Sequence, residues 1–61
     1  MTYTTKELTP ELAMAFMGFY ITNINNSWRH ERTNNGFKVV CLNITEDQKA
    51  QIIKWEKGEI L

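Results

Sequence analysis

The sequence of 61 residues predicts a single small α+β domain, spanning residues 1–61. Three observations predict it. The long apolar run at residues 9–25 is typical of a helix. Asn35-Gly36 lies between two strand-like segments, which is typical of a β-hairpin. A capping pattern that begins at Thr45 predicts a shorter C-terminal helix.

Residues 2–5, with the sequence TYTT, have side chains that favour strands. Two interpretations of this segment stay open at the sequence level. It is either a third, short edge strand beside the hairpin or an extended, solvated arm that leads into the first helix.

The first helix has a clear start. The hydroxyl of Thr9 can accept a hydrogen bond from the first turn, and Pro10 suits the first helical position. Glu11 places a negative charge at the positive end of the helix dipole. We expect the helix to fray over residues 23–27, where Asn and Ser side chains offer the backbone other hydrogen bonds.

The apolar side chains of this helix cover an unusually wide arc of about 220°, against roughly 100° for an ordinary core-facing stripe. One sheet face cannot cover so wide an arc. Either the rest of the chain wraps around the helix, or a second polypeptide covers part of it. The side chains that define the arc are Leu12, Met14, Phe16, Met17, Phe19, Tyr20, Ile21 and Ile24.

The hairpin is predicted to have a two-residue type I′ turn at Asn35-Gly36, with positive φ at both residues. That register places His30 opposite Cys41. The second strand is apolar on both faces and should be buried, whereas the first is polar and resembles an edge strand. We expect the long helix to pack on the sheet face that carries Val40, Leu42 and Ile44.

The second helix should start with a capping box between Thr45 and Gln48 and end before Gly58. Its apolar positions form two flanks, one with Ala50 and Ile53 and the other with Ile52 and Trp55. Because a small hairpin can bury only one flank, Trp55 either covers the core or anchors a partner.

The sequence contains little that suggests catalysis. Its three glycines are far apart, which argues against a phosphate-binding loop. His30 and Cys41 are the only soft metal ligands, whereas a structural zinc site needs four. As cross-strand neighbours they could form a nucleophilic pair, but a buried, inert cysteine is the stronger interpretation. We therefore expect no enzymatic activity, no cofactor or metal, and no small-molecule substrate.

Charge and targeting features suggest a cytoplasmic protein that does not enter a membrane. The formal net charge is zero, which gives no general attraction to anionic lipid. The N-terminal residues lack the features of a signal peptide. The uninterrupted apolar stretch at residues 12–21 is shorter than the roughly 20 residues that span a bilayer.

The function that these features favour is protein binding. We expect a small stand-alone regulator, such as an inhibitor, an adaptor or an antitoxin-like protein from a bacterial or viral genome. It would occupy a surface of a larger protein or form a homodimer. Aromatic residues and methionine are enriched in the cores of protein interfaces. The candidate partner-binding residues are Met14, Phe16, Met17, Phe19, Tyr20, Ile52 and Trp55.

The alternative is weak nucleic-acid binding through the hairpin. Arg29, Arg32 and Lys38 against Glu31 give this segment a surplus of positive charge, and Trp28 could stack on a base. Three basic groups on a neutral protein would bind only weakly and in a salt-sensitive way.

Overall fold

The computed structural model describes residues 1–60, including the side chains of residues 1–58. It confirms the α+β class, with a three-stranded antiparallel sheet and two helices. The elements in chain order are β1 (Tyr3–Thr4), α1 (Pro10–Asn23), β2 (Trp28–Arg32), β3 (Phe37–Cys41) and α2 (Glu46–Ile60).

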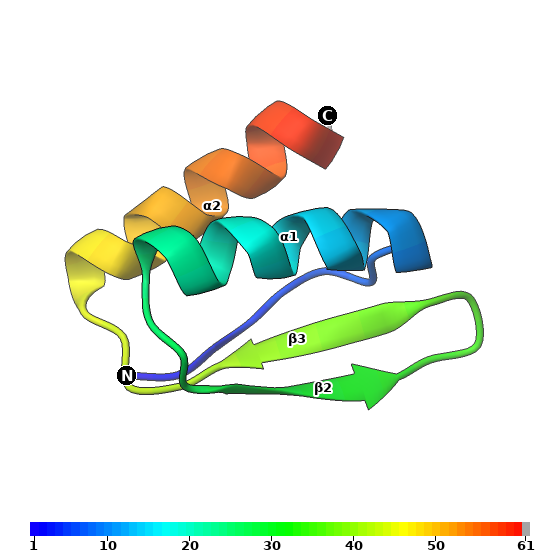
Figure 1. Ribbon diagram of the computed structural model, residues 1–61, viewed down its shortest axis with the longest axis horizontal. Helices are drawn as coiled ribbons and strands as arrows, with labels where there is room; N and C mark the ends of the chain where they lie inside the picture. Colours follow the sequence, from blue (N-terminus) through cyan, green and yellow to red (C-terminus); the bar gives the residue numbers. More distant parts are fainter. Residues whose placement is uncertain (61) are drawn as a thin grey trace.

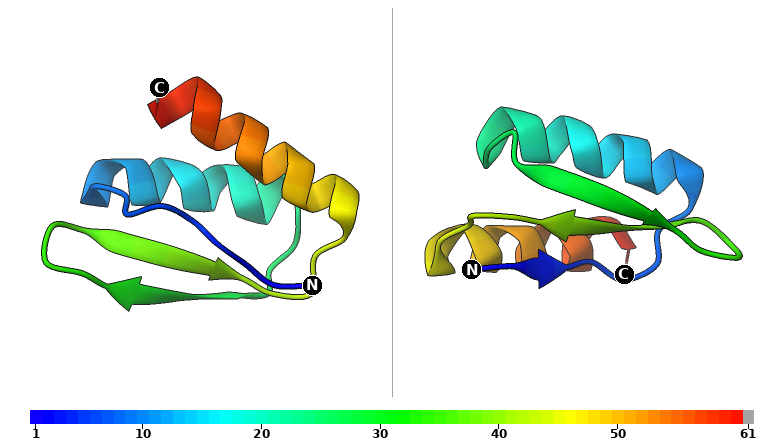
Figure 2. Two further views of the ribbon diagram at one scale, coloured as in Figure 1. Left: turned by 180° about the vertical axis from the view of Figure 1, so that it is seen from behind. Right: turned by 90° about the horizontal axis from the view of Figure 1, so that it is seen from below.

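The molecule has two layers (Figure 1). Both helices lie on the same face of the sheet, and the other face is open (Figure 2). The strand order is β1-β3-β2, so β3 is central and β2 lies at one edge of the sheet. Seen from below, α1 lies towards the β2 side and α2 towards the β1 side (Figure 2).

The N-terminal segment forms a strand, which resolves the choice between a strand and an arm. Tyr3 pairs with Cys41 of β3, and Thr4 pairs with Val40. Thr5 continues the contact, because its hydroxyl accepts a hydrogen bond from the buried N–H of Val39 at 3.0 Å. The segment therefore shields the edge of β3 that the hairpin leaves open.

The predicted two-residue turn is wrong. Arg32 pairs with Phe37, so the hairpin loop has four residues, 33–36. Within residues 1–60 the one positive φ is that of Asn43, at 54°, so neither Asn35 nor Gly36 adopts the left-handed conformation of a type I′ turn. The register shifts by two residues, which leaves each side chain on its predicted side of the ribbon because strand side chains alternate with a period of two.

The prediction of the packed sheet face is also wrong. The helices cover the face of β3 that carries Phe37, Val39 and Cys41. Val40 is buried on the opposite face, and Leu42 is half-buried. Since β3 is apolar on both faces, its pattern could not select one of them.

Strand alternation groups Ile44 with Val40 and Leu42, but its side chain lies with Val39 and Cys41 in the core under the helices. It follows the end of β3, and the left-handed residue Asn43 interrupts the strand alternation just before it. The alternation therefore does not govern where its side chain points.

The helix starts follow the predicted chemistry. The hydroxyl of Thr9 accepts a hydrogen bond from the Leu12 N–H at 3.2 Å. At the second helix, the hydroxyl of Thr45 accepts from the Gln48 N–H at 3.1 Å, and the Gln48 side chain accepts from the Thr45 N–H at 3.0 Å. The predicted end of this helix is wrong, because α2 continues through Gly58 to Ile60.

Candidate functional site

The structure separates the predicted partner-binding residues into two groups. Phe16, Tyr20 and Ile52 are fully buried, with 0% of each residue exposed. They form the core and offer nothing to a partner of the folded protein. Met17, Phe19 and Trp55 are half-buried, whereas Met14 is 77% exposed. The wide apolar arc of α1 is therefore covered by its own chain on one side and open on the other.

An apolar groove lies between the first half of α1 and the edge of the sheet formed by β2. Its volume is about 540 Å³. We call it the α1–β2 groove, and its lining residues are Pro10, Ala13, Met14, Met17, Trp28, His30 and Phe37.

The floor of the groove is a row of three rings from the hairpin. The Trp28 and His30 ring centroids are 6.1 Å apart, and those of His30 and Phe37 are 5.9 Å apart. Register explains the row, because Trp28 and His30 alternate onto the same face of β2 and Phe37 lies on the matching face of β3.

The opposite wall of the groove is supplied by α1. Met14 and Met17 are three residues apart and therefore lie on one side of the helix, with the exposed Ile21 further along it. Methionine is flexible and polarizable and adapts to the shape of a partner. A continuous apolar surface of this kind is typical of a protein-interaction site.

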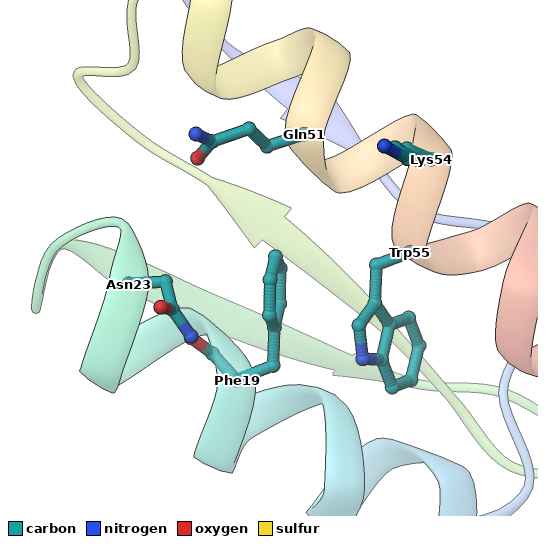
Figure 3. A pocket seen from close by; sticks show the side chains of 5 residues that line it. All are labelled: Phe19, Asn23, Gln51, Lys54 and Trp55. Carbon is teal, nitrogen blue, oxygen red and sulfur yellow. The ribbon is translucent and has the colours of Figure 1, made fainter.

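A second pocket, of about 320 Å³, lies between the two helices. Phe19 and Asn23 of α1 face Gln51, Lys54 and Trp55 of α2 across it (Figure 3). Its amide and ammonium groups make it more polar than the α1–β2 groove.

Trp55 covers one end of the core beside this second pocket. Its ring meets Phe16 edge-on at a centroid distance of 5.2 Å, and it stacks on Phe19 at 5.7 Å. The sequence left two roles open for Trp55, to cover the core or to anchor a partner. These contacts favour the first role, in which the indole covers the core.

Glu56 is a buried carboxylate that the sequence pattern missed. A glutamate on a helix of a small domain ordinarily faces solvent, but Glu56 is only 3% exposed. Its carboxylate accepts hydrogen bonds from the Tyr3 hydroxyl at 2.5 Å and from the Lys6 N–H at 3.0 Å. The sequence did contain one signal of this burial. Glu56 follows the apolar Ile52 by four residues, and residues four apart share one side of a helix. The contacts fasten α2 to the N-terminal segment.

The hypothesis of a nucleophilic His30–Cys41 pair does not fit the structure. Cys41 pairs with Trp28, and His30 pairs with Val39. Burial, together with the nearby Glu56 charge, raises the pKa of the Cys41 thiol from 9.0 to about 12. The thiol is therefore protonated at neutral pH and packs as a small apolar group. Among the side chains of residues 1–58, no group of three or more His, Cys, Asp or Glu residues could hold a metal ion.

The raised pKa values of Tyr3, Tyr20 and Cys41 predict a loss of stability at alkaline pH. Burial and the hydrogen bond to Glu56 raise the pKa of Tyr3 from 10.0 to about 12, close to the raised pKa of Cys41. Between pH 9 and 12 the folded state therefore holds more protons than the unfolded chain, and stability falls as the pH rises. Urea unfolding across this range should show the decline. Tyr3→Phe should make the decline above pH 10 less steep, with the contribution of Tyr20 remaining, and an unchanged slope would contradict the role of Tyr3.

The candidate nucleic-acid-binding residues do not share one surface. The side chains of Trp28 and Arg32 lie on the helix-side face of β2, and those of Arg29 and Lys38 lie on the open face. Lys38 is also directly opposite Glu31, which offsets its charge. The arrangement lacks the continuous basic surface that follows a phosphate backbone.

None of the helices in the described part of the chain combines the length and the apolarity needed to cross a membrane. Comparisons with protein-family models, with curated proteins and with solved structures found no match to this chain.

Proposed function

We propose that this protein is a small protein-binding regulator that occupies the surface of another chain through the α1–β2 groove and the neighbouring edge of β2. The observation that carries the proposal is the position of the groove beside an edge strand, with Met14 77% exposed at its rim. Its action as an inhibitor, an adaptor or an antitoxin-like protein requires no catalytic step. The free, buried Cys41 is consistent with a reducing compartment such as the cytoplasm.

The backbone of β2 supports this proposal, because alternate residues of this strand direct their N–H and C=O groups away from β3. The Leu42 N–H donates to the Ser27 carbonyl at 3.1 Å, and the Thr33 N–H donates to the Gly36 carbonyl at 2.9 Å. In an antiparallel pair, every second residue points its N–H and C=O groups at the neighbour. Ser27 and Thr33 therefore mark the residues that bond to β3, and the intervening residues 28, 30 and 32 direct theirs outward.

The same three residues place their side chains on the groove side of β2. An extended segment that paired with their outward backbone groups would lie directly beside the groove. Alternate side chains of that segment would point to the groove side, where apolar groups would be buried against Met14 and Met17. Main-chain hydrogen bonds would supply affinity and the groove would supply selectivity, as in other cases of strand addition to a sheet edge.

Site-specific photo-crosslinking tests the proposal. A benzophenone side chain at Met14 should form adducts with a defined polypeptide, either a second copy of this chain or another protein in an extract of cells that express it. The same side chain at Ala15 is the matched control, because Ala15 is exposed on the same helix and lies about 100° further around its axis. Adducts that form equally from both positions, or from neither, would contradict the proposal.

A further inference from the structure

We propose that the chain which occupies this surface is a second copy of the same protein, paired antiparallel through β2 about a twofold axis at His30. This inference rests on the proposed function and names its partner. Three strands from each copy would form one continuous six-stranded sheet, with both helix layers on the same face. The two α1–β2 grooves would then meet above the paired strands.

Backbone geometry limits the possible registers. Opposite residues in an antiparallel pair both direct their N–H and C=O groups at each other or both direct them away. Residues of β2 with outward groups must therefore face one another. The register centred on His30 places His30 opposite itself and Trp28 opposite Arg32 of the second copy. It uses all three outward-facing residues, and each such pair can form two hydrogen bonds.

Charge on the open face selects this register over its neighbours. The sequence of β2 is Trp-Arg-His-Glu-Arg. In the centred register Arg29 lies opposite Glu31 of the second copy, and the same pair recurs on the other side of the axis. A shift of two residues in either direction would place Arg29 opposite Arg29, or Glu31 opposite Glu31. Like charges that face each other directly across strands are destabilising, whereas opposite charges stabilise the pair.

The groove face is complementary in the same register. Trp28 would lie opposite Arg32 of the second copy, a combination that allows a cation–π contact. Met14 would be covered, because the grooves of the two copies approach from either side of the paired strands. Charged residues on an edge strand also serve to keep sheets apart, so the exposed charges of β2 alone would fit a monomer. What favours the dimer is that their order along the strand is self-complementary.

Charge reversal tests this pairing through rescue by mixing. Light scattering of the unmodified chain, from about 10 µM to about 1 mM, should show a molar mass that rises from 7.2 kDa towards twice that value. Arg29→Glu and Glu31→Arg each place like charges opposite one another in a homodimer. Each should weaken self-association at least about tenfold.

An equimolar mixture of the two variants should restore association, because Glu at position 29 of one chain then faces Arg at position 31 of the other, and Glu31 faces Arg29. A variant that has merely lost its fold would not be rescued in this way. Lys54→Glu, a charge reversal at an exposed position of α2, is the matched control and should leave association unchanged. Circular dichroism should show that all variants remain folded.

Two results would overturn the inference: an unmodified chain that stays monomeric at every concentration, or a dimer that neither variant weakens and mixing does not alter. Either result leaves the proposed function separately testable. Photo-crosslinks from Met14 to a different protein would then support the proposed function without the homodimer. The absence of any crosslink would contradict both the proposed function and the homodimer.

Discussion

Replacing Trp55 by alanine should lower the free energy of unfolding by about 3 kcal/mol. The indole packs edge-on against Phe16 and stacks on Phe19, so its removal opens one end of the core. A loss of that size is a large share of the roughly 5–15 kcal/mol that stabilises an ordinary domain. The effect should be severe in a chain of 61 residues.

Thermal and urea denaturation of Trp55→Ala measure this effect. Met14→Ala is the matched control, because Met14 is also a large apolar residue of a helix but is 77% exposed. It should change the free energy of unfolding by no more than about 0.5 kcal/mol. A melting temperature of Trp55→Ala within a few degrees of the parent would show that Trp55 does not cover the core, and would return it to the role of a partner anchor.

Gly36→Ala should destabilise the fold by about 3 kcal/mol, the combined effect of overpacking and of damaged hydrogen bonds. A β-carbon on Gly36 would lie 1.9 Å from the Leu8 carbonyl oxygen, a backbone atom that cannot rotate away. Relief of that overlap would separate the loop from Leu8. It would strain the two hydrogen bonds between Leu8 and Phe37, of 2.6 and 2.8 Å, that hold the N-terminal segment to β3.

Gly18→Ala provides the matched control in the same chain. A β-carbon at Gly18 would meet no atom within 4 Å, and the residue lies in the interior of α1. Alanine should therefore stabilise the helix by about 0.5–1 kcal/mol. Urea unfolding of both variants should give changes of opposite sign. Equal stability of the two variants would mean that the Leu8 contact does not require glycine at position 36.

The parts of the fold that local chemistry determines could be predicted from the sequence. Thr9 and Thr45 begin helices because their hydroxyl groups satisfy N–H groups a few residues away, which involves nothing distant in the chain. The hairpin loop depends on a tertiary contact. Gly36 is required where the chain passes close to Leu8, so the Asn35-Gly36 signal marked the right place but indicated the wrong turn.

The site was harder to predict than the fold, because an apolar pattern shows which residues avoid water but not which element covers them. Phe16 and Met14 belong to the same wide arc, yet one is fully buried and the other is 77% exposed. The contributions of His30 and Phe37 to the groove depend on the hairpin register, which aligns them with Trp28. Glu56 escaped prediction because its partner Tyr3 lies 53 positions away in the sequence.

If the edge of β2 pairs with the same edge of a second copy, amide hydrogen exchange measured by NMR over a range of protein concentrations should report that pairing residue by residue. The amides of Trp28, His30 and Arg32 face away from β3, whereas those of Arg29 and Glu31 face it. In dilute protein the first three should exchange rapidly and the other two slowly. As the concentration rises, the first three should become protected together. Rapid exchange of these three amides at every concentration, in the presence of slow exchange at Arg29 and Glu31, would contradict the pairing of two copies through β2.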